Sequence, residues 1–266
     1  MTADAGPAPG PRRVTALASV LLAPNPGPLT LDGTNTWILR SPGETGCVVV
    51  DPGPDHPEHL ARVAAAGPVL SILLTHGHAD HSAGAATLHA LTGAPVRALD
   101  PAHRLGSEGL GAGDVVAVAG LEIRVLATPG HTADSLSFLL TGDERGDAGS
   151  SGEAGRPGWA TGPAVLTGDT ILGRGTTVVA HPDGRLADYL ASLRLLRELG
   201  DTAVLPGHGP ELPAAGRAAE AYLAHRQQRL EQVSAALARL GRSVEEVSAA
   251  DIVAVVYADV PRALWP

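Results

Sequence analysis

The sequence predicts a protein of the α/β class, in which short apolar strands alternate with helices. Three observations support this class. Residues 69–75 form a continuous apolar run that ends in polar residues, as a buried strand does. Residues 80–91 follow with a helical pattern that Gly93 and Pro95 stop. Several later strands are followed at once by a glycine and a residue that can bind a metal.

The other predicted elements follow the same rhythm of apolar runs separated by turn residues. Strands are predicted at residues 14–22, 36–40, 46–51, 95–99, 115–118, 121–127, 136–140, 164–166 and 203–205. Helices are predicted at residues 57–66, 186–199, 213–240 and 244–256, and the 213–240 segment has room for one helix or two. Residues 142–162, rich in Gly, Ser, Asp and Glu, predict a flexible hairpin insertion.

The composition allows one large domain, or a large domain with a small appendage. Of the 266 residues, 44% are hydrophobic but only 3% are aromatic, so the core must consist mostly of Ala, Val and Leu. The formal net charge is −9, and all 19 basic residues are arginine. This acidic balance argues against a protein that binds nucleic acid mainly by charge neutralisation.

The sequence favours a cytoplasmic protein without a membrane segment. Cys47 is the only cysteine in the sequence, which excludes an intrachain disulfide and fits a reducing compartment. No apolar run reaches the roughly 18 residues that a membrane helix needs. Arg12 and Arg13 precede an apolar run at residues 14–23 that resembles part of a twin-arginine export signal, but a turn follows instead of a clear cleavage site. We therefore interpret this run as the first strand.

The strongest local signal is a cluster of potential metal ligands between a predicted strand and a predicted helix. Residues 75–81 read THGHADH, which brings His76, His78, Asp80 and His81 into one short loop. The end of a buried strand is rigid, and a short loop can turn several side chains towards one point. Imidazole nitrogens and a carboxylate suit zinc, and also iron or manganese. The cluster therefore predicts a metal site.

Three later motifs each place one further ligand type just after an apolar strand. They are PGHT at residues 129–132 with His131, TGDT at 167–170 with Asp169, and PGHG at 206–209 with His208. In each motif a glycine beside the ligand allows a tight turn and a close backbone approach. Each motif is weak when taken singly, but an α/β scaffold can assemble one site from the ends of several strands.

The ordered motifs HxHxDH, PGHT, GDT and PGHG resemble the metallo-β-lactamase superfamily along nearly the whole chain. The resemblance implies an αββα sandwich at residues 12–212, followed by a helical extension at residues 213–266. It also implies two divalent cations at one edge of the sandwich, zinc by preference, with Mn²⁺ or Fe²⁺ as alternatives. The implied ligands are His76, His78 and His131 for one cation, and Asp80, His81 and His208 for the other, with Asp169 bridging both. Asp51 matches the superfamily's early aspartate, which usually supports the metal loop.

A closer resemblance is to the beta-lactamase-like protein 2 group. It rests on NPG at residues 25–27, GTNT at 33–36, GRGTT at 173–177, YxxHR at 222–226 and DIV at 251–253. Members of the group carry a small winged-helix-like unit after the catalytic domain, and this chain would hold the first part of that unit. Animal members are endoribonucleases on single-stranded RNA, and related fungal enzymes release polyketides from thioester carriers. A true β-lactamase is not expected, because such enzymes usually lack the bridging Asp169.

The resemblance predicts a hydrolase whose nucleophile is a hydroxide shared by the two cations. Asp80 would orient this nucleophile, and Asp169 would hold the two cations together. The attacked atom is either the phosphorus of single-stranded RNA or the carbonyl carbon of a small ester or thioester, as in enzymes of the glyoxalase II and polyketide-thioesterase type. The group resemblance favours RNA, whereas the acidic balance and the scarcity of aromatic residues weigh against it.

The segment that follows the GDT motif contains four candidate substrate contacts: Arg174, Thr176, Thr177 and His181. The first three could contact an anionic substrate, or could instead form a turn held by hydroxyl hydrogen bonds. The last could act as an acid or substrate contact, or could be an exposed loop histidine. His56 and His59 also have ligand-like spacing, but we interpret both as solvent-exposed residues at the start of a helix.

Two other functions stay open at this point. A di-iron form of the same site could serve a redox protein, although relatives of that type generally need a flavin partner domain. A binding module that has lost catalysis is the second alternative, and the retention of every ligand type argues against it. We expect no membrane association and see no sign of an obligate protein partner.

Overall fold

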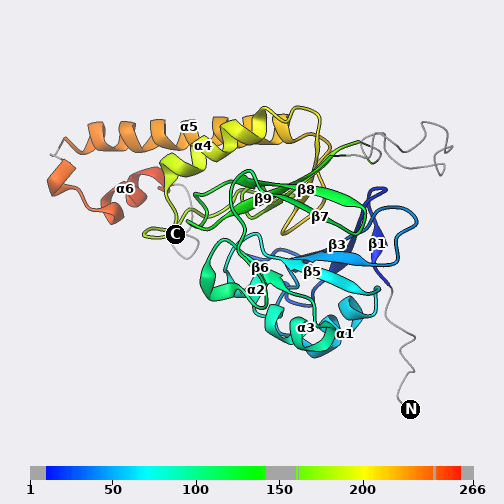
Figure 1. Ribbon diagram of the computed structural model, residues 1–266. Helices are drawn as coiled ribbons and strands as arrows, with labels where there is room; N and C mark the ends of the chain where they lie inside the picture. Colours follow the sequence, from blue (N-terminus) through cyan, green and yellow to red (C-terminus); the bar gives the residue numbers. More distant parts are fainter. Residues whose placement is uncertain (1–9, 142–159, 161, 242–243, 259–266) are drawn as a thin grey trace, which may run out of the picture. The chain divides into compact units, whose positions relative to one another are not determined.

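The computed structural model describes residues 10–141, 160, 162–241 and 244–258 (Figure 1). Most of the predicted insertion at residues 142–162 and of the N-terminal tail therefore lies outside the described residues. The chain divides into two compact units, residues 1–219 and residues 220–266. The first unit contains both β-sheets. No helix within the described part of the chain is long and apolar enough to cross a membrane.

Two sheets form the centre of the first unit. One contains, in spatial order, β1 (Arg12–Arg13), β2 (Ala18–Leu22), β3 (Asn35–Leu39), β4 (Cys47–Val50), β5 (Val69–Leu73) and β6 (Val96–Arg97). The other contains β11 (Ala203–Pro206), β10 (Ala164–Gly168), β9 (Leu136–Leu140), β8 (Leu121–Ala127) and β7 (Val115–Val118). Neighbouring strands are antiparallel except in the pairs β4–β5, β5–β6 and β10–β11, which are parallel.

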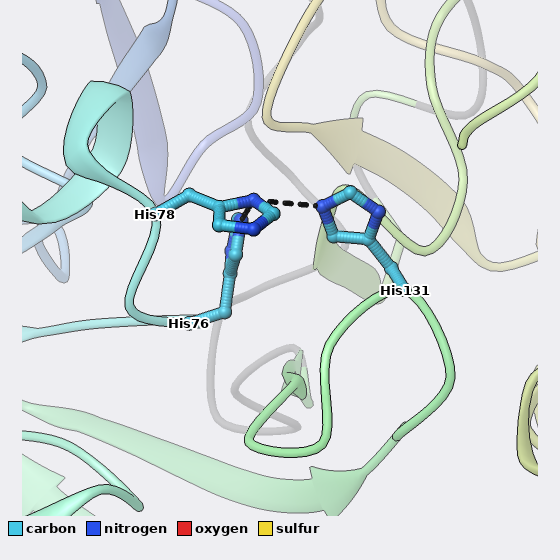
Figure 2. Close-up of side chains that lie close together, drawn as sticks. All are labelled: His76, His78 and His131. Atoms are coloured by element: carbon cyan, nitrogen blue, oxygen red, sulfur yellow. Dashed lines mark hydrogen bonds between the residues drawn. The ribbon is translucent and has the colours of Figure 1, made fainter. Parts of the chain in front are cut away.

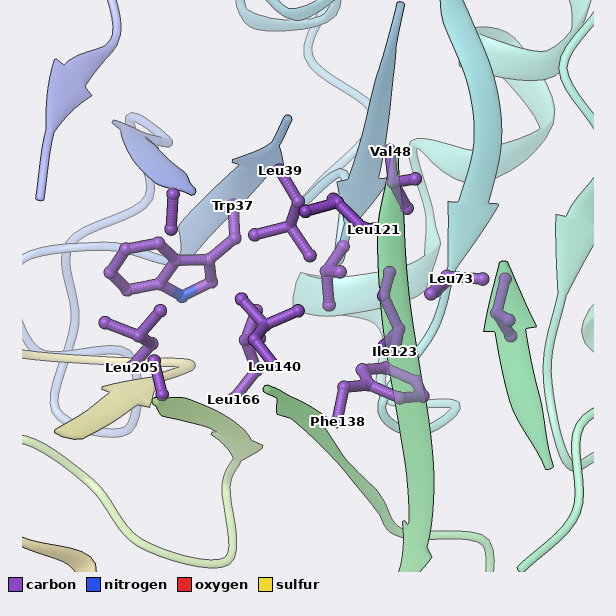
Figure 3. Packing of buried hydrophobic residues seen from close by; sticks show 14 of the residues in the cluster. Trp37, Leu39, Val48, Leu73, Leu121, Ile123, Phe138, Leu140, Leu166 and Leu205 are labelled. Carbon is purple, nitrogen blue, oxygen red and sulfur yellow. The ribbon is translucent and has the colours of Figure 1, made fainter. Parts of the chain in front are cut away.

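The main hydrophobic core lies between the two sheets (Figure 3). Strand alternation directs Trp37 and Leu39 of β3 into this core, whereas Ile38 belongs to the core on the opposite face. From the second sheet, Ile123 and Phe138 meet them and are fully buried. Because both faces of the first sheet are covered, its central strands read as continuous apolar runs.

Helices cover the outer faces of both sheets. The first sheet is covered by α1 (Pro57–Ala64), α2 (Ala79–Ser82) and α3 (Ala85–Thr92) (Figure 1). Leu60 and Leu88 pack between these helices and the sheet in a second core. The second sheet is covered by α4 (Leu186–Arg197), whose Tyr189 hydroxyl donates to the carbonyl of Thr170 at 2.8 Å. The layers are therefore helix, sheet, sheet and helix, which confirms the predicted αββα sandwich.

The helix predicted at residues 80–91 is in fact two helices, because the chain turns at Gly84. The amide of Gly84 donates to the carbonyl of Gly53 at 2.9 Å. A Cβ at position 84 would lie 3.0 Å from the carbonyl oxygen of Pro54 and 3.1 Å from that of Gly53, so glycine allows the start of α3 to approach the loop after β4 this closely.

The C-terminal extension is helical, as predicted. The segment predicted as one or two helices is a single helix, α5 (Ala215–Leu240), which crosses from the first unit into the second. The short 3-10 helix Val244–Glu246 and α6 (Ala249–Val256) follow, and Ser248 and Asp251 form a capping box at the start of α6. The winged-helix-like architecture stays a prediction.

Replacing Phe138 with alanine is expected to lower the free energy of unfolding by about 3–5 kcal/mol, because it leaves a cavity between the two sheets. Chemical denaturation of the metal-free protein measures this loss. Leu91→Ala is the control, since Leu91 is 58% exposed on α3 and its loss should cost under about 1 kcal/mol. Equal losses in the two variants would contradict the packing described above.

Candidate metal centre

The ends of strands from both sheets place the predicted ligands at one edge of the sandwich. His76 and His78 lie in the loop between β5 and α2, and Asp80 and His81 lie in α2 itself. The second sheet supplies the rest: His131 follows β8, Asp169 follows β10 and His208 follows β11. The structure brings all seven together in three overlapping groups whose ligand atoms lie within 4.8 Å of one another. Segments up to 132 positions apart in the sequence, from His76 to His208, therefore meet at this point.

The first group consists of His76, His78 and His131 (Figure 2). The Nδ1 atom of His78 lies 3.1 Å from Nε2 of His76 and 3.0 Å from Nε2 of His131. The three rings point towards one another from two separate loops (Figure 2). Three imidazole nitrogens that converge in this way offer a compact set of neutral donors.

The second group consists of Asp80, His81 and His208. Nε2 of His208 lies 3.1 Å from Nε2 of His81 and 3.1 Å from Oδ2 of Asp80. Both imidazoles are fully buried, whereas the Asp80 side chain is 30% exposed. Asp80 is therefore the member of this group that solvent or a substrate can reach.

Asp169 lies between the two groups and turns one carboxylate oxygen towards each. Its Oδ1 atom is 3.3 Å from Nε2 of His81 and 3.4 Å from Nε2 of His208. Its Oδ2 atom is 3.7 Å from Nε2 of His131. Within the described residues, Oδ1 is buried and has no hydrogen-bond donor of its own. This is the position that a bridging ligand between two cations requires.

Carbonyl groups outside the cluster fix the proton positions on two of the imidazoles. The Nδ1–H of His131 donates to the carbonyl of Val178 at 2.7 Å, and the Nδ1–H of His208 donates to the carbonyl of Gly33 at 3.1 Å. A carbonyl can only accept, so in each neutral ring the proton must lie on Nδ1. Nε2 of each ring then presents a lone pair to the interior of the cluster.

Asp51 and Thr75 orient two more imidazoles. Thr75 donates to Asp51 twice, through its amide at 2.8 Å and its hydroxyl at 2.7 Å. Since that hydroxyl proton is used, the oxygen of Thr75 accepts the Nδ1–H of His76 at 3.0 Å. The Nδ1–H of His81 donates to Asp51 at 2.9 Å. In the neutral form of each ring, Nε2 therefore also faces inward with a lone pair.

The residues present fit a pair of divalent cations. Nε2 of His81 and Nε2 of His208 lie 3.1 Å apart, so a proton or a cation must lie between them. Burial alone would lower the pKa of His81, but Asp169 and Asp51 raise it well above its usual value, so this ring holds the proton until a cation takes its place. Burial lowers the pKa of His76 well below its usual value, so that ring is a neutral donor. Burial alone would raise the pKa of Asp169, but the nearby His81 and His208 hold it far below its usual range, so it is ionised. Neutral imidazoles and ionised carboxylates are the donors that zinc, iron and manganese accept.

Glycines beside the ligands allow the loops to approach one another. A Cβ on Gly207 would lie 2.7 Å from Oδ1 of Asp169 and 2.7 Å from a ring carbon of His81. Gly130 has φ +135°, and a Cβ there would lie 2.3 Å from the backbone of Tyr189. The glycines of the PGHT and PGHG motifs are therefore steric requirements of the cluster.

Residues 33–36 position the loop that carries His208, a role that was not predicted from the sequence. The amide nitrogen of the Asn35 side chain donates to the carbonyls of Pro206 at 3.0 Å and Gly209 at 2.8 Å. Trp37 also donates to the carbonyl of Pro206 through its indole nitrogen at 3.0 Å. The GTNT motif therefore connects the first sheet to the loop of the last ligand. In the sequence, the polar residues of this motif after a turn were the signal that could have indicated this role.

A pocket of about 650 Å³ opens over the cluster. His78, Asp80, His131 and Asp169 line its floor. Its walls are mainly apolar. Their apolar residues are Pro28, Leu29, Leu31, Ala79, Leu172, Val178 and Ala180, and the remaining wall residues are Thr30, Arg174, Gly175, Thr176, Thr177 and Asp183. None of the described residues that line it is phenylalanine, tyrosine or tryptophan. The pocket therefore offers hydrophobic contact without a surface for base stacking.

The predicted substrate contacts divide into two sets. Arg174, Thr176 and Thr177 line the pocket, whereas His181 is exposed and is not among the residues of its wall. Thr177 is buried, and its hydroxyl lies 3.2 Å from Nδ1 of His131. Arg174 forms an ion pair with Asp32, in which Nη2 and Oδ1 are 2.8 Å apart. The substrate roles of these four residues stay predictions.

The interpretation of His59 as a solvent-exposed residue was wrong. Its side chain is 1% exposed, and its Nε2 atom lies 2.9 Å from the hydroxyl of Thr36. Burial, reinforced by the positive charge of Arg62, lowers the pKa of His59 to about 4. His56 instead caps α1, since its Nδ1 accepts from the amide of His59 at 3.3 Å. The polar residues around His59 in the sequence gave no indication that its ring packs under the loop after β4.

The sandwich and the seven-residue cluster define a class of protein, an αββα hydrolase with a candidate dinuclear metal site. The chain belongs to the metallo-beta-lactamase superfamily, whose family model matches residues 29–208.

Curated relatives and solved structures agree with this assignment. The chain is 31% identical to the beta-lactamase-like protein 2 homolog of Caenorhabditis elegans, over 92% of this chain and 77% of the relative. It is 29% identical to an atrochrysone carboxyl ACP thioesterase of Aspergillus fumigatus, over 87% of this chain and 68% of the relative. A beta-lactamase domain protein from Burkholderia ambifaria superposes with a TM-score of 0.70 at 25% identity, covering 96% of this chain and 86% of the other.

A further solved structure, of a protein in a di-iron-bound form, superposes with a TM-score of 0.53 at 27% identity, covering 74% of this chain and 96% of the other.

Asp51→Asn is expected to weaken metal binding by roughly 10–100-fold, because the amide has only one acceptor oxygen. Its NH2 group would face either the amide of Thr75 or the two donors from His81 and the Thr75 hydroxyl. Competition with a chromophoric chelator measures the change in affinity. Asp55→Asn is the matched control, since Asp55 is exposed four residues further on. Unchanged affinity in Asp51→Asn would show that this carboxylate does not orient the ligands.

Burial of His59 predicts a loss of stability in acid. Because its pKa in the folded protein is about 4, below the ordinary 6.5, the unfolded chain takes up the proton first. The contribution is complete above pH 6.5 and falls as the pH drops from 6.5 towards 4, at up to ~1.4 kcal/mol per pH unit. Denaturation of the wild type and of His59→Gln across this range measures the difference. If the two curves stay parallel, His59 does not resist protonation.

Proposed function

We propose that this chain is a metal-dependent hydrolase of esters or thioesters whose acyl group is apolar. The observation that supports this most directly is the pocket over the cluster, which has aliphatic walls and a floor of histidine and aspartate. Leu29 and Val178 expose 71% and 51% of their surface at its edge. An alkyl chain that covers them would bury apolar surface, which is worth about 0.8 kcal/mol for each CH₂ group.

The residues of the cluster have separate roles in this proposal. Two divalent cations, when bound, would make water acidic enough to supply a nucleophile near neutral pH and would polarise the substrate carbonyl. His76, His78 and His131 would hold one cation, and Asp80, His81 and His208 the other, with Asp169 between them. Asp80 is partly exposed and lines the pocket, so its carboxylate can accept a proton from the attacking water and orient it.

The pocket favours this substrate class over single-stranded RNA, which the sequence also predicted. Proteins that bind single strands stack bases on aromatic rings and follow the backbone with basic residues. Among the residues that line this pocket, Arg174 is the one permanent cation, and it is paired with Asp32. An apolar acyl group matches the walls better than a polyanion does. The name of the fungal relative, a thioesterase, agrees with this choice.

A panel of N-acetylcysteamine thioesters with acetyl, butyryl and hexanoyl groups tests the proposal, with protein loaded separately with zinc, manganese or iron. We expect kcat/KM to rise by up to about four-fold for each CH₂ group that enters the pocket. Chelator should abolish the activity and metal should restore it. His131→Ala should lower the rate by more than ~100-fold, since loss of an outer partner of a ligand alone costs 10–100-fold.

Leu29→Asn separates the pocket from the metal chemistry. It should reduce the preference for longer acyl groups and leave acetyl hydrolysis unchanged, because acetyl is too short to reach the rim. Leu91→Asn is the control, since Leu91 is also exposed but lies outside the pocket. Metal-dependent cleavage of a fluorescent single-stranded RNA, without any thioester hydrolysis, would overturn the proposal.

A further inference from the structure

A second cavity, of about 660 Å³, adjoins the pocket over the metal centre, and Arg174 lines both. Arg12 of β1 and Arg62 of α1 also line the second cavity. We call this cavity, with its three arginines, the arginine groove. The three side chains come from a strand, a helix and a loop that are far apart in the sequence. The groove therefore continues from the candidate active site with its own chemical character.

The groove is locally basic although the chain as a whole is acidic. Among the described residues that line it, three arginines lie beside one carboxylate, that of Asp32. Asp32 is paired with Arg174, and Glu211, outside the lining, is paired with Arg12. The side chains of Asp32 and Arg174 are 58% and 49% exposed, and ion pairs of that kind stabilise a protein little. An incoming anion can therefore compete for Arg174 at small cost.

Another cavity that adjoins the pocket is acidic. It has a volume of about 300 Å³ and shares His78 and Asp183 with the main pocket. Asp100 and Asp134 also line this cavity. A negatively charged part of a substrate would be repelled there. Any anionic portion that extends beyond the acyl pocket is thus directed over Arg174 into the arginine groove.

We propose that the arginine groove binds phosphate on the alcohol or thiol portion of the substrate. This inference rests on the proposed function and adds a substrate class to it: acyl esters or thioesters of a phosphorylated small molecule. Guanidinium groups match phosphate because their planar donors form paired, charge-assisted hydrogen bonds with its oxygens. The acyl group occupies the apolar pocket, and the phosphorylated portion lies across Arg174 towards Arg12 and Arg62.

The reaction balances with water as the only co-reactant. The oxygen of water forms a bond to the carbonyl carbon, and the bond from that carbon to sulfur breaks. The acyl group leaves as a carboxylate, one proton of water ends on the thiol sulfur, and the other is released to solvent. The phosphate groups are unchanged, so the arginines contribute to binding and not to bond breaking.

Two thioesters with the same acyl group test the groove by kinetics. Butyryl-coenzyme A carries phosphates, whereas butyryl-N-acetylcysteamine has the same thiol end without them. We expect Arg12→Gln and Arg62→Gln each to raise KM for the coenzyme A ester by roughly ten-fold and to leave the other ester unchanged. Arg13→Gln is the matched control, since Arg13 is the neighbour of Arg12 but lines a different cavity.

Glu211→Gln is expected to change KM in the opposite direction. It removes the partner of Arg12 without removing the arginine, so KM for the coenzyme A ester should fall by two- to five-fold. Equal effects of Arg12→Gln and Arg13→Gln on the coenzyme A ester, or equal effects of Arg12→Gln on both esters, would overturn the inference. Arginine-dependent cleavage of a single-stranded RNA in place of the thioester would overturn it too.

Direct binding separates the failure of this inference from the failure of the proposed function. Calorimetry with desulfo-coenzyme A and chelator-treated protein needs neither the metals nor turnover. Weaker binding in Arg12→Gln and Arg62→Gln, but not in Arg13→Gln, supports the groove even if the wild type hydrolyses no thioester. Absence of binding to the wild type, or the same affinity in all variants, overturns the groove even if thioesters are hydrolysed.

Discussion

The hydrogen bonds around Asp51 are the constraint on which the site depends. One buried carboxylate accepts from Thr75 twice and from His81 once, and through the Thr75 hydroxyl it also sets the proton of His76. Asp51 follows β4 and Thr75 follows β5, and these two strands are parallel neighbours. Asp51 adopts φ +52°, a left-handed conformation that costs energy for a residue with a Cβ. The strain is retained where it aims a carboxylate at the first ligand loop.

The same site also depends on the second sheet. His131, Asp169 and His208 leave the ends of β8, β10 and β11, so their positions follow from how the two sheets pack. Contacts between the sheets reinforce this at the backbone level, since the amide of Asn35 donates to the carbonyl of Gly207 at 2.8 Å. Formation of the complete ligand set is therefore coupled to formation of the core between the sheets. Neither sheet alone supplies all seven ligands.

Much of this arrangement could be predicted from the sequence because it depends on local pattern. The strands Val115–Val118, Leu121–Ala127 and Leu136–Leu140 have their predicted bounds, since alternation and turn residues mark both ends. What escaped prediction depends on distant contacts. The break at Gly84 arises from its approach to Gly53, and the burial of His59 arises from its contact with Thr36. Neither pair is close in sequence, so no periodicity reveals it.

The charge distribution shows why net charge alone is a poor guide to a substrate. The whole chain carries −9, which argued against a polyanionic ligand, yet three of its arginines line one cavity beside the active-site pocket. Asp100, Asp134 and Asp183 line another cavity that adjoins the same pocket. A charge distribution of this kind selects an orientation as well as a ligand. The anionic end of a molecule with one apolar and one anionic end is attracted by the arginines and repelled by the aspartates. The acyl carbon is then positioned over the histidine and aspartate floor by both ends of the substrate at once.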